Sequence, residues 1–574
     1  MKSLIKKMVP DNCLIVVMIV TSVSFIAQAQ QVKSFKGVQH EKYEGEFIPI
    51  DRASMPVSNA YSYNSIGFTV TQVNVNEDGE NIVGDAANEP SMAIDPNNPD
   101  VKVIGWRQFN TIGNNFRQAG FGYTTDGGLN WTFPEVIDPG VFRSDPVLDT
   151  DTAGNIFYNS LTVNENDDYL CTVYKSTDGG MSWDDGVFAQ GGDKQWMSVD
   201  KSDGVGSGNM YAFWTAAYSI CPPYNFTRSV DNGATFEDCN LLPGEPYWGT
   251  TTVDNNGNLY IGAFMDDQFV VAKSSNAQFP GATVVWDYMQ PVDLGGYVSA
   301  FAGYESPNPT GLLGQTNIAV DQSEGPNHGN IYLVCSVLRY SPYDPLDVMF
   351  AKSTDDGTTW SEPVRINDDL TNIAWQWLAT MSVSPDGRID VVWLDTRDNA
   401  GSVDSKLYYS WSFDAGENWG ENVALSESFD PHLGWPQQDK MGDYFHLISD
   451  ETGADLAWAA TFNGEQDVYF SRIENEFVGL NEQSAVSDYL ELYQNNPNPA
   501  SDKTVIRFNL REKTEVKLTL SDISGKEIQL LQQGLLSSGV HSYTFTTKHL
   551  SPGIYYYTLT GNGISETRKM IVTR

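Results

Sequence analysis

The chain has 574 residues, of which 40% are hydrophobic and only 19% charged, and its 74 acidic residues outnumber its 34 basic residues. A chain of this length and composition buries large cores, which excludes a disordered protein. The formal net charge of −40 argues against binding to nucleic acid or to anionic membranes, and is typical of a soluble protein outside the cell.

Residues 1–29 have the three parts of a secretory signal peptide. Three lysines precede an apolar run over residues 14–26, and Ala27-Gln28-Ala29 fits a cleavage site. The apolar run is short for a membrane span and no other stretch is long enough, so we expect no transmembrane segment after signal removal. Residues 30–60 are expected to form an irregular lead-in.

Residues 61–472 repeat one strand pattern seven times, which predicts an all-β fold, a seven-bladed β-propeller. Each unit begins with a short apolar strand that ends in Asp or Ser, such as residues 91–95, and continues with a second and a third strand. The seventh unit lacks an outer strand, whereas residues 70–78 resemble the outer strand of the sixth unit. We therefore expect the N-terminal strand to complete the last blade and remove an exposed sheet edge.

An octapeptide with the spacing Ser/Thr-x-Asp-x-Gly-x-Thr/Ser/Asn-Trp/Phe follows the third strand of five units. Its aspartate can accept turn amide hydrogens, its glycine can take positive φ, and its aromatic residue begins the next strand. The octapeptide resembles the Asp-box, or bacterial neuraminidase repeat, of the sialidase-type β-propellers. The resemblance implies that architecture and a structural role for the box aspartates, which are Asp126, Asp178, Asp231, Asp355 and Asp414.

In a propeller, function usually lies on the face where loops enter the innermost strands and join the second and third strands. Aromatic rings beside carboxylates and amides suit a sugar, whose CH face stacks and whose hydroxyls need donors and acceptors. The catalytic candidates on this face, from which the two carboxylates of a glycosidase would come, are Asp145, Asp193, Glu245 and Asp443. The substrate-binding candidates are Arg107, Arg339, Arg397, Lys194, Gln195, Trp196, Trp248, Trp375 and Trp377. The alternative is structural, with tryptophans that wedge neighbouring blades and charges that pair with each other.

The sialidase resemblance implies three arginines that hold a substrate carboxylate, a tyrosine nucleophile assisted by glutamate, and an aspartate acid/base. The nearest string to the first arginine motif, Phe142-Arg143-Ser144-Asp145-Pro146, lacks its Ile-Pro and follows the first box, and the family has six blades. Arg107, Arg339 and Arg397 are therefore candidates for a substitute cluster. An insertion over residues 280–314 is expected to fold over this face, where its aromatic residues wall a pocket or pack the loop.

We expect no required cofactor, because the histidines and carboxylates match no metal-site spacing. Acidic turns at residues 149–155 and 200–209 allow a calcium ion, although Asx turns account for them equally well. The two interpretations stay open at this point.

Four cysteines remain after signal removal, and an export compartment allows disulfides. Cys221 and Cys239 flank one hairpin and are the expected pair. Cys171 and Cys335 fall in separate strands, where we expect buried thiols.

Residues 473–487 form a polar linker by composition, and the alternating strands of residues 488–574 predict a small Ig-like β-sandwich. This last segment, from Leu492-Tyr493-Gln494-Asn495-Asn496-Pro497 to Lys569-Met570-Ile571-Val572, resembles the type A sorting domain of the type IX secretion system of Bacteroidota. The resemblance implies contact with that machinery, passage through the outer membrane, and removal of the domain on arrival.

The sequence leaves three functions open. The first is a secreted or cell-surface propeller that binds an extracellular glycan or glycoprotein, and the second is an exo-acting glycoside hydrolase of sialidase-like type. The third is a protein-interaction scaffold. A pocket with a carboxylate pair favours the hydrolase, a shallow aromatic shelf favours binding, and a sealed channel favours the scaffold.

Overall fold

The computed structural model describes residues 45–65, 67–340, 344–474, 490–493, 495, 498, 500–511, 513–521, 526–561 and 564–573. The predicted signal peptide, the first part of the lead-in and most of the linker lie outside the described residues. The regular structure is almost all strand, with two 3-10 helices, η1 (Arg52–Ser54) and η2 (Arg397–Asn399), which confirms the all-β prediction. Within the described ranges, no helix has the length and apolar character needed to cross a membrane.

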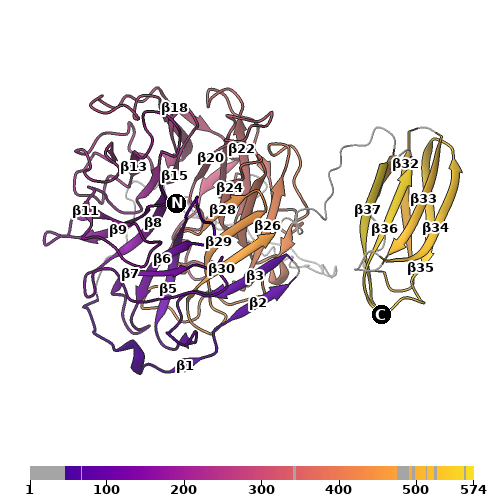
Figure 1. The fold of residues 1–574 in the computed structure, drawn as a ribbon, viewed down its shortest axis with the longest axis horizontal. Coiled ribbons are helices and arrows are strands. Elements are labelled where there is room, and N and C mark those ends of the chain that lie inside the picture. Colours follow the sequence, from indigo (N-terminus) through magenta and orange to yellow (C-terminus); the bar gives the residue numbers. More distant parts are fainter. Residues whose placement is uncertain are drawn as a thin grey trace, which may run out of the picture. The chain divides into compact units, whose positions relative to one another are not determined.

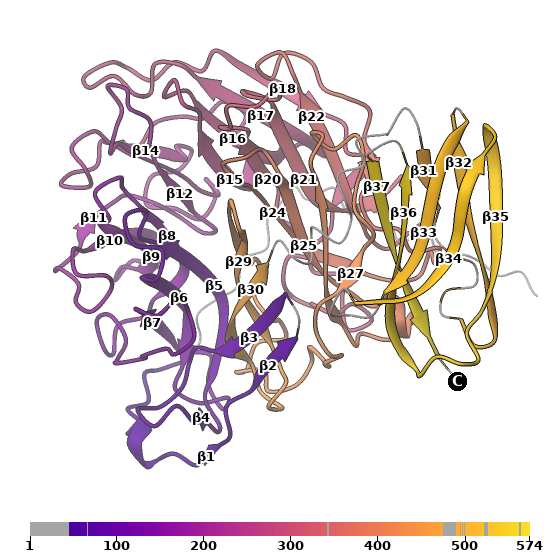
Figure 2. The same cartoon turned by 45° about the vertical axis from the view of Figure 1, so that its right-hand side comes forward.

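Residues 62–474 form seven antiparallel sheets around a common centre (Figures 1 and 2). The first three contain β5 (Ala86–Ile94), β6 (Lys102–Phe109) and β7 (Arg117–Thr124); β8 (Ser144–Thr150), β9 (Ile156–Val163), β10 (Tyr169–Ser176) and β11 (Val187–Phe188); and β12 (Trp196–Val199), β13 (Met210–Phe213) and β14 (Phe226–Ser229). The fourth contains β15 (Tyr247–Val253), β16 (Leu259–Met265), β17 (Gln268–Ser274) and β18 (Tyr288–Val292).

The fifth sheet contains β19 (Gly296–Val298), β20 (Asn317–Val320), β21 (Ile331–Arg339), β22 (Asp347–Ser353) and β23 (Val364–Arg365). The sixth contains β24 (Gln376–Val383), β25 (Ile389–Asp395), β26 (Lys406–Ser412) and β27 (Val423–Ala424). The seventh combines β28 (His446–Asp450), β29 (Gly453–Ala460) and β30 (Asp467–Glu474) with β2 (Ser62–Ser65) and β3 (Phe68–Gln72). The inner strands β5, β8, β12, β15, β20, β24 and β28 each contact the next, and β28 contacts β5, so the ring is closed.

The ring closes through the N-terminal strand, as the sequence predicts. β3 pairs with β30 from Phe68 opposite Ile473 to Gln72 opposite Tyr469. Beyond β3, the Asn74 side chain donates to Asp467 (2.8 Å) and accepts the Val468 backbone N–H (3.0 Å). The regular strand lies a few residues earlier than the predicted 70–78, because the pairing ends at Gln72 and side-chain bonds take over. The lead-in predicted as irregular contains one short strand, β1 (Val57–Ser58), which pairs with β4 (Asn81–Ile82) beyond β3.

All five predicted Asp-boxes adopt the same turn. In the second sheet, Asp178 accepts the backbone N–H (2.9 Å) and the hydroxyl of Ser182, and Ser176 donates to the same carboxylate (2.8 Å). The Ser176 hydroxyl also accepts the Gly180 N–H (2.9 Å). The equivalent carboxylates of the other boxes make the corresponding bonds. The boxes therefore lie at hairpin ends, and their aspartates are structural.

The predicted disulfide between Cys221 and Cys239 is present, and Cys171 and Cys335 are buried free thiols, as expected. The segment from residue 490 forms two antiparallel sheets of its own. One contains β31 (Leu490–Leu492), β32 (Lys503–Leu510) and β35 (Gly539–Thr546), and the other β34 (Glu527–Leu536), β33 (Thr514–Ser521), β36 (Gly553–Gly561) and β37 (Ile564–Val572). Their apolar faces share one core, which includes Phe508, Leu518 and Tyr557.

Replacing Asn74 with Ala is expected to lower the free energy of unfolding by about 1 to 3 kcal/mol, because the buried Val468 N–H and the Asp467 carboxyl lose their partner. Urea unfolding followed by tryptophan fluorescence measures the loss. Thr69→Ala, a half-buried change on β3, should cost less. Equal losses for the two variants would contradict the special role of Asn74.

Replacing Asp178 with Ala is expected to lower the free energy of unfolding by about 1 to 2 kcal/mol. Burial alone would raise the pKa of Asp178, but hydrogen bonds from Ser182 and Ser176 hold it below its ordinary value. A carboxyl with a depressed folded-state pKa stabilises fully above its unfolded pKa of about 4, and this contribution disappears as the pH falls through the folded value. The difference between wild type and variant should therefore shrink in acid, whereas the exposed control Asp185→Ala should show little difference at any pH.

Candidate functional site

The inner strands of four blades enter the ring through a β-bulge. The register shifts after Asn88, Ser144, Tyr247 and Trp377 in the first, second, fourth and sixth sheets. At these bulges Glu89, Asp145, Trp248 and Leu378 take positive φ of 49° to 54°, which is uncommon for residues other than glycine. A bulge redirects a side chain away from the regular alternation, and in the first two blades the redirected side chain is a carboxylate.

Seven charged side chains from four blades meet near these bulges in a group that we call the central charge cluster. None is more than 6% exposed, so the whole group lies inside the protein. Its members are Glu89, Arg107, Asp145, Asp193, Lys194, Lys440 and Asp443. Three of the four predicted catalytic acids therefore do converge.

Asp443 lies at the centre of the contacts in this cluster. Its Oδ2 accepts both Lys194 Nζ (2.9 Å) and Lys440 Nζ (2.8 Å). Lys440 also lies 3.5 Å from Glu89 Oε1, and Arg107 Nε lies 3.1 Å from Glu89 Oε2. The Lys194 backbone N–H donates to Asp145 Oδ2 (3.1 Å). The cations thus cross-link acids from different blades.

The four carboxyls of the cluster divide into two kinds. Burial raises the pKa of Glu89 to about 7 and that of Asp193 to about 6, and the nearby Arg107 and Lys194 offset this only in part. Burial also opposes ionisation of Asp145 and Asp443, but Lys194 and the other cations hold the pKa of both below the ordinary value. Carboxyls whose pKa values diverge in one group are the arrangement that acid/base chemistry uses.

Two of the predicted substrate-binding residues, Lys194 and Gln195, instead contact members of the central charge cluster. Lys194 pairs with Asp443 and lies 3.8 Å from Asp193 Oδ1, and Gln195 Nε2 donates to the Asp145 carbonyl. Both side chains are buried. Within the described structure, Asp193 Oδ2 and Gln195 Oε1 are buried without a hydrogen-bond partner.

Only the last part of the insertion predicted over residues 280–314 lies over the cluster, together with residues 431–440, whereas residues 288–292 form β18, the outer strand of the fourth sheet. The Leu312 N–H donates to Asp443 Oδ1 (2.7 Å), and the Asn308 amide donates to the Gly442 carbonyl (2.8 Å). The Thr310 N–H donates to the Asp439 carbonyl (3.1 Å), which joins the two covering segments. On the face where the sequence predicts the functional site, Asp443 is therefore covered by these segments.

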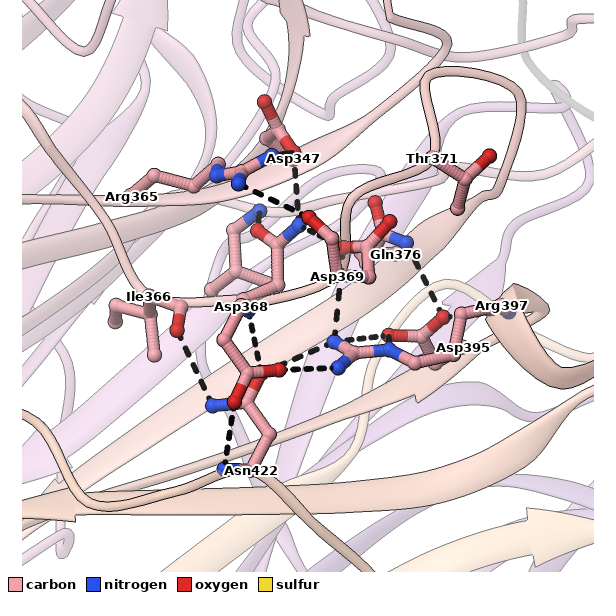
Figure 3. A network of polar contacts seen from close by, with 12 residues as sticks. Asp347, Arg365, Ile366, Asp368, Asp369, Thr371, Gln376, Asp395, Arg397 and Asn422 are labelled. Atoms are coloured by element: carbon pink, nitrogen blue, oxygen red, sulfur yellow. Dashed lines mark hydrogen bonds and ion pairs between the residues drawn. The ribbon is translucent and has the colours of Figure 1, made fainter. Parts of the chain in front are cut away.

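The three predicted arginines are divided between two networks, so the structure does not gather them into one anion site. Arg107 belongs to the central charge cluster. Arg397 lies in a second network at the ends of β22 to β25 (Figure 3), where Nε donates to Asp395 (2.8 Å) and Nη1 to Asp368 (2.6 Å). Arg339 donates to Asp347 (2.6 Å).

The second network is held together by side chains between neighbouring blades. Asn367 donates to both Asp347 (2.8 Å) and Asp369 (2.7 Å), and Arg365 lies 3.4 Å from the same Asp347 carboxylate. Figure 3 shows Arg397 directed between Asp368 and Asp395. A guanidinium that already binds carboxylates is not available for a substrate carboxylate. Arg397 joins the fifth and sixth blades, whereas Arg107 and Arg339 pair with acids of their own blades.

The remaining candidates lie apart from the cluster. Trp248 and Trp377 are fully buried, and Trp377 donates to Ser405 (3.0 Å), so neither offers a ring face to a sugar. Trp375 is half-buried against the core, and Trp196 lines a cavity in the centre of the ring. Glu245 is exposed and outside the cluster. Trp248 and Trp377 thus pack in the core and do not line an open site, whereas Trp196 lines the cavity.

The covering segments carry an aromatic group that we call the aromatic shelf, formed by the exposed Tyr304 and the half-buried His432 and Trp435. Tyr304 is 67% exposed, more than any other aromatic side chain of the described residues. Its ring centroid lies 6.3 Å from that of Trp435, which lies 4.7 Å from that of His432. The Tyr304 hydroxyl donates to Asp439. The sequence singled out Tyr304 and missed the other two rings, although a tryptophan in a loop of Gly and Pro residues was a usable signal.

The acidic turns expected to allow calcium are closed by their own hydrogen bonds. Asp151 accepts the N–H groups of Ala153 (3.0 Å) and Asn155 (2.9 Å), and Asp200 accepts that of Ser202 (2.9 Å). In the part of the chain that the structure describes, no group of three or more His, Cys, Asp or Glu is arranged to hold a metal ion. The observed bonds are those of Asx turns.

A family model described as the secretion system C-terminal sorting domain matches residues 495–573. The chain thus carries this sorting domain and is exported through the type IX secretion system to the cell surface or the extracellular space. Among curated proteins, none matches the chain.

Several solved structures are similar to the chain. One is a protein of unknown function from Dyadobacter fermentans, with 14% identity, 71% of this chain and 99% of that chain covered, and a TM-score of 0.42. A Hadza microbial sialidase has 14% identity, coverage of 68% and 66%, and a TM-score of 0.38. A Penicillium chrysogenum α-L-arabinanase has 12% identity, coverage of 73% and 99%, and a TM-score of 0.36. These values carry no conclusion about what this chain binds or hydrolyses.

The Asp193 carboxyl should make stability depend on pH. Its folded pKa of about 6 lies above the unfolded value of about 4, so the folded state binds more protons in this window and stability falls as the pH rises through it. Asp193→Asn removes this contribution, and the stability of wild type relative to the variant should drop by roughly 1 to 3 kcal/mol between pH 4 and 7. Urea unfolding at several pH values measures it. A parallel pH dependence in both proteins would contradict the raised pKa, and the exposed Glu245→Gln is the control.

Proposed function

We propose that this exported protein is a glycan-binding propeller, which captures a carbohydrate or glycoprotein on the aromatic shelf and does not hydrolyse it. The observation that carries the proposal is the exposure of Tyr304 beside Trp435, with the Asp439 carboxylate bound to the Tyr304 hydroxyl. Aromatic faces stack on the CH face of a sugar, and a carboxylate accepts its hydroxyls. An exposed aromatic group of this kind marks an interaction site.

The shelf is held in place before any ligand arrives. Trp435 Nε1 donates to the Pro431 carbonyl (2.9 Å), and His432 Nε2 lies 3.0 Å from the Ser306 carbonyl. The Asp439 carbonyl accepts both the N–H (3.1 Å) and the hydroxyl (3.2 Å) of Thr310. Because little ordering remains to be done on binding, most of the contact energy contributes to affinity.

One observation favours the alternative, a glycoside hydrolase, namely the carboxyls of raised and lowered pKa in the central charge cluster. A glycosidase, however, places two carboxyls on either side of the scissile bond with room for water. Here Asp145, Asp193 and Asp443 are all buried, and Asp443 is bound by Leu312 of a covering segment and by two lysines. The geometry therefore supports binding over hydrolysis.

Replacing Trp435 with Ala in the full-length protein is expected to weaken glycan binding at least about five-fold, since the loss of one stacked ring is worth roughly 1 kcal/mol or more. A glycan array identifies the ligand, and isothermal titration calorimetry measures its affinity. Tyr304→Ala should act in the same direction, because it removes the other face of the shelf.

The control is Phe413→Ala, which removes an exposed aromatic ring within the last Asp-box and should leave binding unchanged. Unaltered binding by the double variant lacking Tyr304 and Trp435 side chains would contradict the shelf. Turnover of aryl glycosides by the wild type would instead support the hydrolase, and binding of a protein partner stripped of glycans would support a scaffold.

A further inference from the structure

The centre of the ring contains a cavity of about 450 Å³, which we call the axial channel. Residues from β8, β12, β15, β20, β24 and β28 line it, six of the seven inner strands. A volume of this size lies within the range of small-molecule sites. The channel is separate from the aromatic shelf, because no residue that lines the channel belongs to the shelf.

The axial channel has one closed end and one open end. At the closed end, the Trp196 ring lies 5.8 Å from His446 and 5.4 Å from Tyr444, and Lys194 and Asp443 of the central charge cluster come shortly before Trp196 and His446 in the sequence. At the other end, the lining residues Lys201, Gln322 and Pro385 are exposed. A ligand therefore enters from the side of the turns that follow the inner strands.

Hydroxyl groups dominate the polar part of the lining. Ser198 Oγ lies 2.6 Å from Thr251 Oγ1, and Ser382 Oγ accepts the Ser449 N–H (2.9 Å). Ser449 is 8% exposed, and its hydroxyl has no hydrogen-bond partner in the described structure. That oxygen is itself inaccessible, because Ser449 shares the buried face of β28 with Leu447, whereas His446 and Ile448 face the channel, so a ligand in the channel does not reach it.

The lining carries no net charge at neutral pH. Its one acid, Asp149, pairs with its one basic residue, Lys201, and also accepts the Val199 N–H (2.7 Å). His446 Nδ1 accepts the Met92 N–H (3.1 Å), so the neutral ring carries its proton on Nε2. Burial lowers the pKa of His446 to about 4. The negative charge of Asp149 opposes this lowering, and the positive charge of Lys201 lowers the pKa further. A charged ligand would lose its hydration without gaining a partner of opposite charge.

We infer that the axial channel binds a small, neutral, hydroxyl-rich molecule, of the class of free monosaccharides and polyols. The serine and threonine hydroxyls that face the channel exchange hydrogen bonds with those of the ligand. Trp196 closes the far end with an apolar surface for the ligand's CH groups. This site does not depend on the proposed function of the shelf.

The experiment titrates the full-length protein with D-glucose and D-mannitol, and with D-glucuronate and N-acetylneuraminate as charged counterparts, by calorimetry and thermal unfolding. We expect the neutral compounds to bind and raise the melting temperature, and the acids to bind at least about ten-fold more weakly. Absence of binding by both neutral compounds, or equal binding of the acids, overturns the proposal.

Two variants locate the site. Ala319→Leu fills the channel from β20 and should abolish binding, whereas Ala319→Ser should retain it. Unaltered binding in Ala319→Leu would overturn the channel itself.

Trp435→Ala separates the two proposals. It should leave monosaccharide binding in the channel intact and reduce only glycan binding on the shelf. Ala319→Leu should do the reverse, so either site can fail without the other.

Discussion

The pairing of β3 with β30 is the constraint on which the rest of the propeller depends. It joins the two ends of the ring, and several contacts exist only because those ends are adjacent. Asn88 of the first blade donates to Gln466 of the last (2.6 Å), and Glu89 lies 3.5 Å from Lys440. Closure also makes the inner strands converge on one axis, which forms the axial channel and brings the charged residues at the strand entries together.

The central charge cluster is best understood as a set of cross-links at this convergence. Asp443 binds lysines from the third and the last blade, and Glu89 binds Arg107 of its own blade and Lys440 of the last. Removing one member of a buried ion pair costs about 3 to 5 kcal/mol, because its partner is left uncompensated. The charged residues therefore have a structural role that requires no catalysis. This explains why acids on the expected functional face need not be catalytic.

The sequence was sufficient for features that depend on neighbours in the chain. The Asp-box turns, the closing strand and the Cys221–Cys239 disulfide follow from local patterns, and all are present. Spacing also placed Asp145, Asp193 and Asp443 at the correct end of their strands. It did not show that Trp377 is core or that Arg107 and Arg397 bind acids in separate networks, since these facts depend on side-chain directions between blades. Glu245 shares the strand-entry position but is exposed, so position alone did not determine burial.

The covering segments determine how the two ends of the ring differ. Where Leu312 and Asn308 close over Asp443 and Gly442, the acids become unreachable, and the outer surface of the same segments presents Tyr304 and Trp435. An exposed shelf is suited to one part of a large glycan that remains in solvent, because it imposes no limit on size. At the opposite end, where Lys201 in the channel mouth is exposed, the channel admits only what fits a cavity of about 450 Å³. One insertion thus accounts both for the loss of a reachable acid pair and for two surfaces of different selectivity.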